Sequence, residues 1–400
     1  MLDVYVSGMK NRIYLDYNAT TPCDQEVVDH MLPFFNEIYG NPSSAHHAYG
    51  WLAKETIQES SKIIAKTLGV SAHDLVYTSG ATESINMILK SFSSKFKHKG
   101  NHIITCKTEH KAVLDTCKYL EKNEGLSVTY LDVDAKGIVD LDQLIKAIRQ
   151  ETILISIMHS NNETGVIQPL RKIRQMVEGK GIYIFSDATQ SLGKVDLDEV
   201  FDSVDFSCFS GHKFYGPKGI GLVYAKDNSK NNILQSLIQG GGQQKMMRGG
   251  TMNTPAIAGF TKAVELSLAN SFSERQRLMI LRNKLESGLL KIEGSSSNST
   301  AIDRLPNTSN ISFAYVDGFK LLSGLSKYIA VSNGSACNSA NENPSHVLMA
   351  MGVDPNLAFS SIRFSLGRFT TDADIDKVID ILDQEVAKQR ASNILWERRS

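Results

Sequence analysis

A lysine in a tight turn is the residue of this 400-residue chain that is best placed for covalent chemistry. Lys213 lies in residues 210–221, a glycine- and proline-rich run between two short β-type stretches, beside a hydroxyl and an imidazole. An amine near a strand end can form a Schiff base when desolvation or a neighbouring cation lowers its pKa. Turn lysines are more often simply exposed to solvent, so the interpretation needs support from other segments.

Polar residues follow four of the expected strands. They supply an imidazole (His110), amides (Asn161 and Asn162), a carboxylate with a further amide (Asp187 and Gln190) and the amine of Lys213. In parallel α/β sheets, ligands bind beyond the carboxyl ends of the strands. The sequence therefore favours a site at this edge over loops that only keep the protein soluble.

The run 79–84, Ser-Gly-Ala-Thr-Glu-Ser, stands between an expected strand and an expected helix. Such a turn directs free backbone N–H groups at whatever lies above it, which suits a phosphate. An ordinary helix N-cap supplied by Ser79 or Thr82 explains the run equally well. The chain has neither a GxGxxG nor a Walker sequence, so nicotinamide cofactors and ATP gain no support.

Cys337 lies in a run of small and polar residues, 332–339, that has no apolar periodicity. A free cysteine usually behaves as a small buried hydrophobe, so both a bystander and a reactive thiol stay open. The five cysteines are scattered, without a CxxC pair or metal-ligand spacing. This usage is typical of a reduced intracellular protein, and we expect no metal site.

The elements that must position these residues alternate regularly. Strands are expected at 75–78, 102–106, 127–131, 152–158, 182–186, 205–209 and 220–225, and helices at 85–92, 110–119, 141–149 and 170–178. This alternation predicts an α/β fold with a mostly parallel, doubly wound sheet.

The segments on either side of this region have other patterns. Helices are expected at 24–39, 47–68, 256–269, 273–292, 318–325 and 374–389, strands at 13–16, 310–313, 328–331 and 362–365, and a low-complexity stretch at 294–299. The part after residue 255 reads as a second, smaller α+β domain.

Composition excludes several classes of function. The chain carries 43 basic and 43 acidic residues, so its balance gives no sign of binding to nucleic acid or to anionic membranes. No apolar stretch approaches the length of a membrane span, and the first residues lack a secretory signal pattern. We expect a cytoplasmic protein.

Taken together, residues 78–84, 161–165, 187–190, 210–219 and 334–337 resemble the cysteine desulfurases of the NifS/IscS branch. These are pyridoxal-phosphate (PLP) enzymes of the class V aminotransferase group, with fold-type I. The resemblance extends from about Ile13 to Trp396. It implies a large PLP-binding α/β domain at 13–260. It also implies a small α+β domain made of 1–12 and 261–400, which carries a mobile cysteine loop at about 332–343.

The resemblance implies a role for each matched position. Lys213 would hold the cofactor covalently and move protons at the substrate α-carbon, Asp187 would pair with the pyridine nitrogen, and His110 would stack over the ring. Arg363 would bind the substrate carboxylate. The other cofactor contacts would be Asn162 and Gln190 at the ring hydroxyl, Ala81, Thr82, Ser210 and His212 at the phosphate, and Thr251, which would reach the phosphate from the partner subunit of a homodimer.

The implied reaction converts L-cysteine to L-alanine and leaves a persulfide on Cys337. The sulfur would pass to scaffold or carrier proteins for iron–sulfur cluster assembly, and also to tRNA thiolation. The alternatives are a selenocysteine lyase or another class V aminotransferase-type enzyme, and a non-catalytic sulfur-carrier or assembly component. Cys337 argues against a plain aminotransferase, and Lys213 with Asp187 and His110 argues against a non-catalytic protein. Residues 242–248 depart from the family's usual Gly-Gly-Gln-Glu-x-Gly, which bears on the Thr251 contact.

Overall fold

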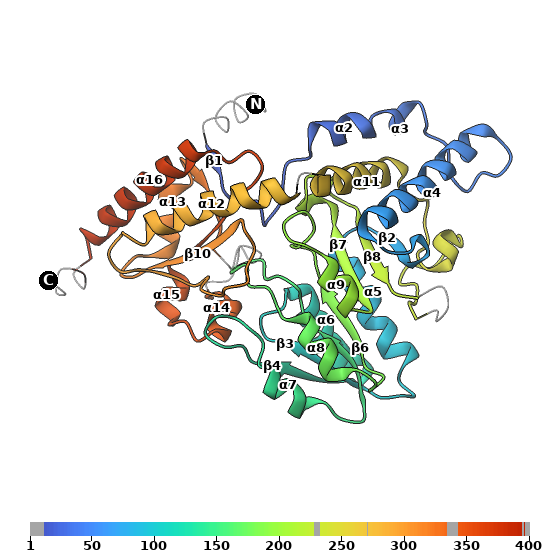
Figure 1. Ribbon diagram of the computed structural model, residues 1–400, viewed down its shortest axis with the longest axis horizontal. Coiled ribbons are helices and arrows are strands. Elements are labelled where there is room, and N and C mark those ends of the chain that lie inside the picture. The colour runs from blue at the N-terminus through green and yellow to red at the C-terminus, as the bar shows by residue number, and fades with distance from the viewer. Residues whose placement is uncertain (1–11, 228–232, 270, 334–342, 394–395, 397–400) are drawn as a thin grey trace.

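A seven-stranded sheet forms the centre of the larger part of the molecule (Figure 1). The structure is a computed structural model that describes residues 12–227, 233–269, 271–333, 343–393 and 396. The strands are β2 (Leu75–Thr78), β3 (His102–Cys106), β4 (Ser127–Leu131), β5 (Thr152–Ser156), β6 (Tyr183–Asp187), β7 (Phe206–Ser210) and β8 (Gly221–Ala225), in the order β2-β8-β7-β6-β5-β3-β4. Strands β3 to β7 pair in parallel and β8 pairs antiparallel with both neighbours, so the mostly parallel α/β fold is confirmed.

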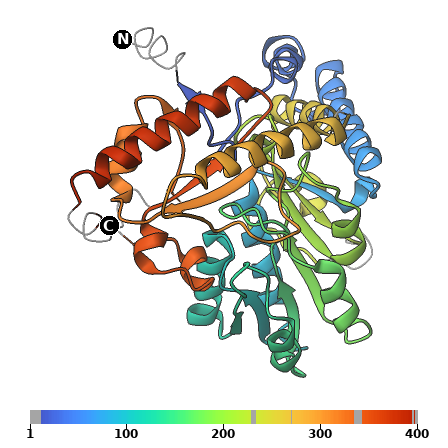
Figure 2. The same ribbon diagram turned by 60° about the vertical axis from the view of Figure 1, so that its left-hand side comes forward.

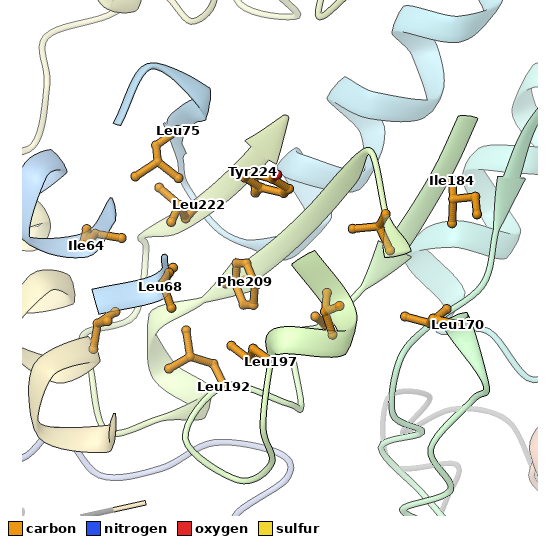
Figure 3. Close-up of a cluster of buried hydrophobic side chains, with 14 of the residues drawn as sticks. Ile64, Leu68, Leu75, Leu170, Ile184, Leu192, Leu197, Phe209, Leu222 and Tyr224 are labelled. Atoms are coloured by element: carbon orange, nitrogen blue, oxygen red, sulfur yellow. The ribbon is translucent and has the colours of Figure 1, made fainter. Parts of the chain in front are cut away.

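Helices cover both faces of this sheet, which is why most residues of its strands are buried. All five residues of β5 are buried, for example. One face carries α4 (Ala48–Leu68), α7 (Leu141–Ala147), α8 (Leu170–Val177), α9 (Asp198–Ser203) and α11 (Thr254–Ala269), and the other carries α5 (Ala81–Lys95) and α6 (Lys111–Glu124). Figure 3 shows Phe209 and Leu222, from β7 and β8, in one buried cluster with Ile64 and Leu68 of α4.

A smaller unit is built on a three-stranded antiparallel sheet. Its strands are β9 (Ser295–Ser297), β10 (Thr308–Phe313) and β12 (Ser361–Ser365), and its helices are α12 (Ser271–Leu289), α13 (Gly318–Leu325) and α16 (Asp372–Arg390). Helices α12 and α16 run side by side in both views (Figures 1 and 2). Leu15 packs in this core because β1 (Ile13–Tyr14) pairs in parallel with β11 (Ile329–Ala330).

One local prediction is wrong, and some short elements were not predicted. The helix expected at 24–39 is instead α2 (Gln25–Met31) followed by α3 (Pro33–Asn36), because Pro33 lacks the N–H that a continuous helix requires. The low-complexity stretch at 294–299 contains β9, whose serines pair with β10. The short helices α14 (His346–Ala350) and α15 (Pro355–Phe359) were not predicted. The domain boundary near residue 260 stays a prediction.

The described residues contain neither a membrane-spanning helix nor a cluster of metal ligands. None of their helices combines the length and the apolar character that a membrane crossing requires. Their His, Cys, Asp and Glu side chains form no cluster of three or more that could hold a metal ion.

Candidate active site

A cavity of about 1470 Å³ lies where the carboxyl edge of the seven-stranded sheet meets the smaller unit. Ten of the twelve predicted site residues line it: Ala81, Thr82, His110, Asn162, Asp187, Gln190, Ser210, His212, Lys213 and Arg363. Thr251 does not line it, and Cys337 lies outside the described residues. The cavity thus brings together groups from both parts of the molecule.

Lys213 ends a single 3₁₀ turn, Gly211–Lys213, directly after β7. Two glycines make this connection possible: a Cβ on Gly211 would come within 2.8 Å of the Pro217 carbonyl, and one on Gly216 within 2.9 Å of the Gly211 carbonyl. The turn directs the amine of Lys213 to the carbonyl oxygens of Asn18 and Ala19, to each of which it donates at 2.8 Å. The amine is therefore held in place at the wall of the cavity.

His110 is the N-cap of α6, and its Nδ1 accepts a hydrogen bond from the backbone N–H of Ala112 at 3.1 Å. A neutral ring in this position carries its proton on Nε2. Burial lowers the pKa of His110, the nearby Lys213 lowers it further, and Asp187 opposes them. The site therefore presents a neutral, flat imidazole at neutral pH.

Asp187 is the last residue of β6 and is only 7% exposed. Its Oδ1 accepts from the backbone N–H of Thr189 at 2.9 Å and from the thiol of Cys208 at 3.5 Å. These contacts orient the carboxylate from within its own loop and the neighbouring strand. A fixed carboxylate that lines a cavity suits a protonated ring nitrogen.

The amino end of α5 faces the same cavity, and Ser210 and His212 lie beside it. Its N-cap is Gly80, at φ 152°, and no side chain caps it. The interpretation of residues 79–84 as an N-cap supplied by Ser79 or Thr82 is therefore wrong. An uncapped helix start with the positive end of the helix dipole is a favourable site for a phosphate.

Arg363 reaches the cavity from the middle of β12, and its side chain is 6% exposed. Its Nη2 donates to Oδ1 of Asp16 at 2.8 Å, and its Nη1 donates to the carbonyl of Asn162 at 3.2 Å. The buried Nε has no hydrogen-bond partner. An arginine with an unused donor beside a cavity can bind a carboxylate there.

Sequence reasoning missed Asn18, which joins the two walls of the cavity. Its carbonyl accepts from Lys213 and, at 2.9 Å, from Nε2 of Gln190. Its side-chain Nδ2 donates to Thr308 at 2.8 Å and to the carbonyl of Asn162 at 3.1 Å. The sequence signal was only a polar turn at 16–22, because the partners of Asn18 lie 144 to 347 residues further along the chain.

Ser345 and His346, also missed, bring the start of α14 to the cavity. The hydroxyl of Ser345 donates to Oε2 of Glu163 at 2.5 Å, and Nε2 of His346 donates to the carbonyl of Glu109 at 3.0 Å. Burial raises the pKa of Glu163. These bonds fix the described chain just after the segment that contains Cys337.

Thr251 is exposed and lines a separate cavity of about 170 Å³ with Phe34 and residues 38–42 and 252–255. The segment that contains Thr251 is nonetheless connected to α5, which lines the large cavity, because Arg248 pairs with Glu83 of α5 at 3.0 Å. The side chain of Gln244 bonds both the N–H and the carbonyl of Tyr77, at 2.7 and 2.8 Å, along edge strand β2. The residues that depart from the family pattern thus dock this segment on the sheet.

The groups in the large cavity fit pyridoxal phosphate. An amine (Lys213) matches its aldehyde, the uncapped start of α5 matches its phosphate, and Asp187 matches its ring nitrogen. Gln190 and Asn162 supply amides for its ring hydroxyl. The unpartnered Nε of Arg363 leaves a donor for the carboxylate of an amino-acid substrate.

Comparisons with known proteins agree with this geometry. The profile of the family described as Aminotransferase class-V matches residues 13–378. A curated relative from Klebsiella pneumoniae, named cysteine desulfurase IscS, is 46% identical over 97% of this chain and 96% of its own length. A solved structure titled NifS-like protein superposes with a TM-score of 0.87 at 39% identity, over 94% of this chain and 99% of that one. Another, titled SspA in complex with cysteine, has a TM-score of 0.78 at 36% identity, over 90% of this chain and 100% of that one.

Proposed function

This chain belongs to the class-V aminotransferase family and, within it, to the cysteine desulfurases; from that premise we propose that it uses pyridoxal 5′-phosphate to take sulfur from L-cysteine. One observation carries the proposal: a single cavity collects Lys213, Asp187, His110 and Arg363 beside the uncapped start of α5. The relatives do not favour a selenocysteine lyase, another aminotransferase-type enzyme or a non-catalytic carrier.

The side of the cavity formed by the carboxyl edge of the seven-stranded sheet, here called the sheet-edge wall, binds and orients the cofactor. When bound, pyridoxal phosphate withdraws electrons from the substrate α-carbon, so that the bond between Cβ and sulfur can break. Asp187 keeps a proton on the ring nitrogen, and the N–H groups at the start of α5 bind the phosphate together with Ser210. The neutral ring of His110 covers the ring plane and excludes water.

Lys213 holds the cofactor and then moves the proton of the substrate. Its amine takes the proton from the α-carbon and returns a proton to the product. The carbonyls of Asn18 and Ala19, which it now contacts at 2.8 Å, hold the amine whenever it is unattached. Arg363 binds the substrate carboxylate through the guanidinium N–H groups that Asp16 and Asn162 leave free.

Sulfur transfer is assigned to Cys337. Its thiolate attacks the substrate sulfur, and the Cβ–S bond breaks with its electron pair staying on the carbon. The carbon then takes a proton and leaves as alanine, while the sulfur stays on Cys337 as a persulfide. On one side of this segment Ser332 pairs with the backbone of Arg363, and on the other Asn343 lines the cavity. We propose that acceptor proteins for iron–sulfur assembly and tRNA thiolation receive the sulfur.

The test uses purified protein loaded with pyridoxal phosphate and supplied with L-cysteine and a thiol reductant. Wild type should produce alanine and sulfide in equal amounts. Cys337→Ala should keep the absorption band of the bound cofactor and release no sulfide, whereas the matched control Cys23→Ala should behave as wild type. Unchanged sulfide release by Cys337→Ala would exclude this thiol as the acceptor. L-selenocysteine, assayed in parallel, measures the preference between sulfur and selenium.

We further propose a homodimer in which Thr251 completes the partner's cavity, since within one chain Thr251 is exposed and apart from the other site residues. Co-expressing Lys213→Ala with Thr251→Ala tests this arrangement. If Thr251 acts across the interface, the mixed dimer contains one intact site, and its activity exceeds that of either variant alone. Absence of any gain would contradict the proposal.

A further inference from the structure

A second lysine, Lys194, contacts Gln190 and Asn18 beside the residues proposed to bind the cofactor. Lys194 follows Gln190 by one turn of the loop after β6, and its Nζ donates to Oε1 of Gln190 at 2.6 Å and to Oδ1 of Asn18 at 3.2 Å. Both partners are buried, at 5% and 1% exposure. In the part of the chain that the structure describes, these bonds join the amine only to neutral amides, and no carboxylate forms an ion pair with it.

The contact determines which end of the Gln190 amide is available. Oε1 accepts from Lys194, and one proton of Nε2 goes to the carbonyl of Asn18 at 2.9 Å. If the amide turned over, its NH₂ group would face the amine of Lys194, and its oxygen would face the Asn18 carbonyl oxygen. The second N–H of Gln190 is therefore what this side chain offers to the cavity that it lines.

We propose that Lys194 is a positioning residue: it fixes the Gln190 amide so that only an N–H donor faces the cavity, which selects a cofactor with an ionised ring hydroxyl. The inference rests on the proposed function, because it assumes that the cavity holds pyridoxal phosphate. An acceptor oxygen in the ligand matches the donor, whereas the turned amide would place two oxygens against each other.

Lys194 and Lys213 also share a partner, Asn18. The carbonyl of Asn18 accepts from Lys213 at 2.8 Å, and its Oδ1 accepts from Lys194 and, at 3.2 Å, from Nδ2 of Asn307. One buried asparagine therefore carries the contacts of both lysines. Thr308 and Asn307 also hold Asn18, so Asn18 should keep its place, and cofactor affinity should not change through it, when the amine of Lys194 is removed.

The charge of Lys194 also affects the basicity of the Lys213 nitrogen. The charged groups that face the Lys194 amine are Lys213 and Arg363, and burial together with these cations lowers its pKa well below the usual value. The interaction is mutual, so a positive Lys194 makes protonation of the Lys213 nitrogen less favourable. Loss of Lys194 should make that nitrogen more basic, and loss of the donor to the ring oxygen should do the same.

The experiment compares cofactor-free and cofactor-loaded forms of Lys194→Met with wild type. We expect the Kd for pyridoxal phosphate, measured by fluorescence on the cofactor-free protein, to rise about tenfold, which corresponds to one lost hydrogen bond. The midpoint of the pH titration of the bound cofactor's absorption should rise by about one pH unit. Lys172→Met makes the same exchange on the exposed face of α8 and should change neither value.

A double-variant cycle separates positioning from a general structural effect. If Lys194 acts through Gln190, then Lys194→Met should weaken binding no further, to within about twofold, in a Gln190→Leu background. Additive losses, or a Kd and a midpoint that both stay at wild-type values in Lys194→Met, would overturn the proposal. Failure of wild type itself to bind pyridoxal phosphate would instead refute the proposed function.

Lys194→Arg keeps the inference testable even when the methionine variant does not fold. A cavity of about 180 Å³ beside Lys194 provides room for the larger guanidinium group. Because arginine retains the donor, the variant should bind the cofactor within about threefold of wild type. A folded Lys194→Arg protein, judged by thermal unfolding, that binds as poorly as Gln190→Leu would contradict the positioning role.

Discussion

The two walls of the large cavity are built in different ways. On the wall formed by the seven-stranded sheet, Asp187 ends a strand, His110 caps the start of a helix, and residues close in sequence hold both. Asp187 is oriented by Thr189, two residues away, and His110 by Ala112, also two residues away. On the wall formed by the smaller unit, Arg363 projects from mid-strand and is held by Asp16, 347 residues away in sequence.

This difference separates cofactor binding from substrate binding. Asp187 and His110 depend on local turns, so they should keep their arrangement when contacts between the two parts of the molecule are weakened. The orientation of Arg363 depends on the N-terminal segment and on Asn162, so it exists only when both parts are docked. The cofactor site should therefore tolerate changes that abolish recognition of the substrate carboxylate.

The largest effect is expected on the sheet-edge wall, at Lys213, to which the cofactor is proposed to attach. Lys213→Ala should lower turnover of L-cysteine by about 10³-fold or more, since both the attachment point and the proton carrier are lost. The variant should remain folded, as judged by thermal unfolding, and should bind the cofactor reversibly. Turnover within tenfold of wild type would mean that another group moves the proton.

A smaller effect is expected on the opposite wall. Arg363→Lys keeps the charge but loses the planar fork, and it should reduce kcat/KM for L-cysteine by about 100-fold. The Kd for pyridoxal phosphate should stay within about twofold of wild type, because the sheet-edge wall is intact. An equal loss of cofactor affinity would contradict the separation of the two walls.

Asp16→Asn tests the long-range contact itself. The Arg363 and Asp16 side chains are 6% and 20% exposed, so breaking the pair leaves a mostly buried cation and should cost about 3 kcal/mol of unfolding free energy. Urea unfolding measures this cost. Asp132→Asn, which breaks the exposed pair with Lys107, is the control and should cost much less unfolding free energy. Equal costs for the two variants would show that the Arg363 contact is no stronger than a surface pair.

The smallest effect is expected on the stability of the seven-stranded sheet in acid, measured as its free energy of unfolding. His102 in β3 is buried between the hydroxyls of Thr129 and Thr152, and burial lowers its pKa to about 4. Below pH 6.5 the unfolded chain takes up the proton, whereas the folded chain does so only near pH 4. Stability present at pH 7 is therefore lost as the pH falls through this window, by about 1–2 kcal/mol at pH 5.

Unfolding of wild type and His102→Gln at pH 7 and pH 5 measures this contribution, and the glutamine variant should lose less stability between the two values. The two tryptophans, Trp51 in α4 and Trp396 beside Tyr315, report on opposite sides of the molecule. Single-tryptophan variants should show the α4 side unfolding first in acid. Simultaneous loss of both signals would show that the two parts unfold as one cooperative unit.

The sequence by itself determined the presence of the sheet, the mostly parallel direction of its strands and most of the chemistry at its edge. Strand and helix periods are local properties, and a short loop leaves its side chains near the strand end that precedes it. Lys213, Asp187, His110 and Asn162 could therefore be assigned to one site. The wrong local prediction arose where a single proline interrupted a helical pattern. Strand β9 was missed because its serines have no strand character and join the sheet by backbone pairing.

Only the tertiary structure decided how that edge is completed. Asp16, Asn18 and Ser345 have no periodic or motif signal, and each acts through partners more than 100 residues away. The same holds for the amine of Lys194, whose bond to Asn18 spans 176 residues. Such contacts form when two separately packed cores dock, because burial then forces each polar group to find a partner among whatever side chains the docking brings near.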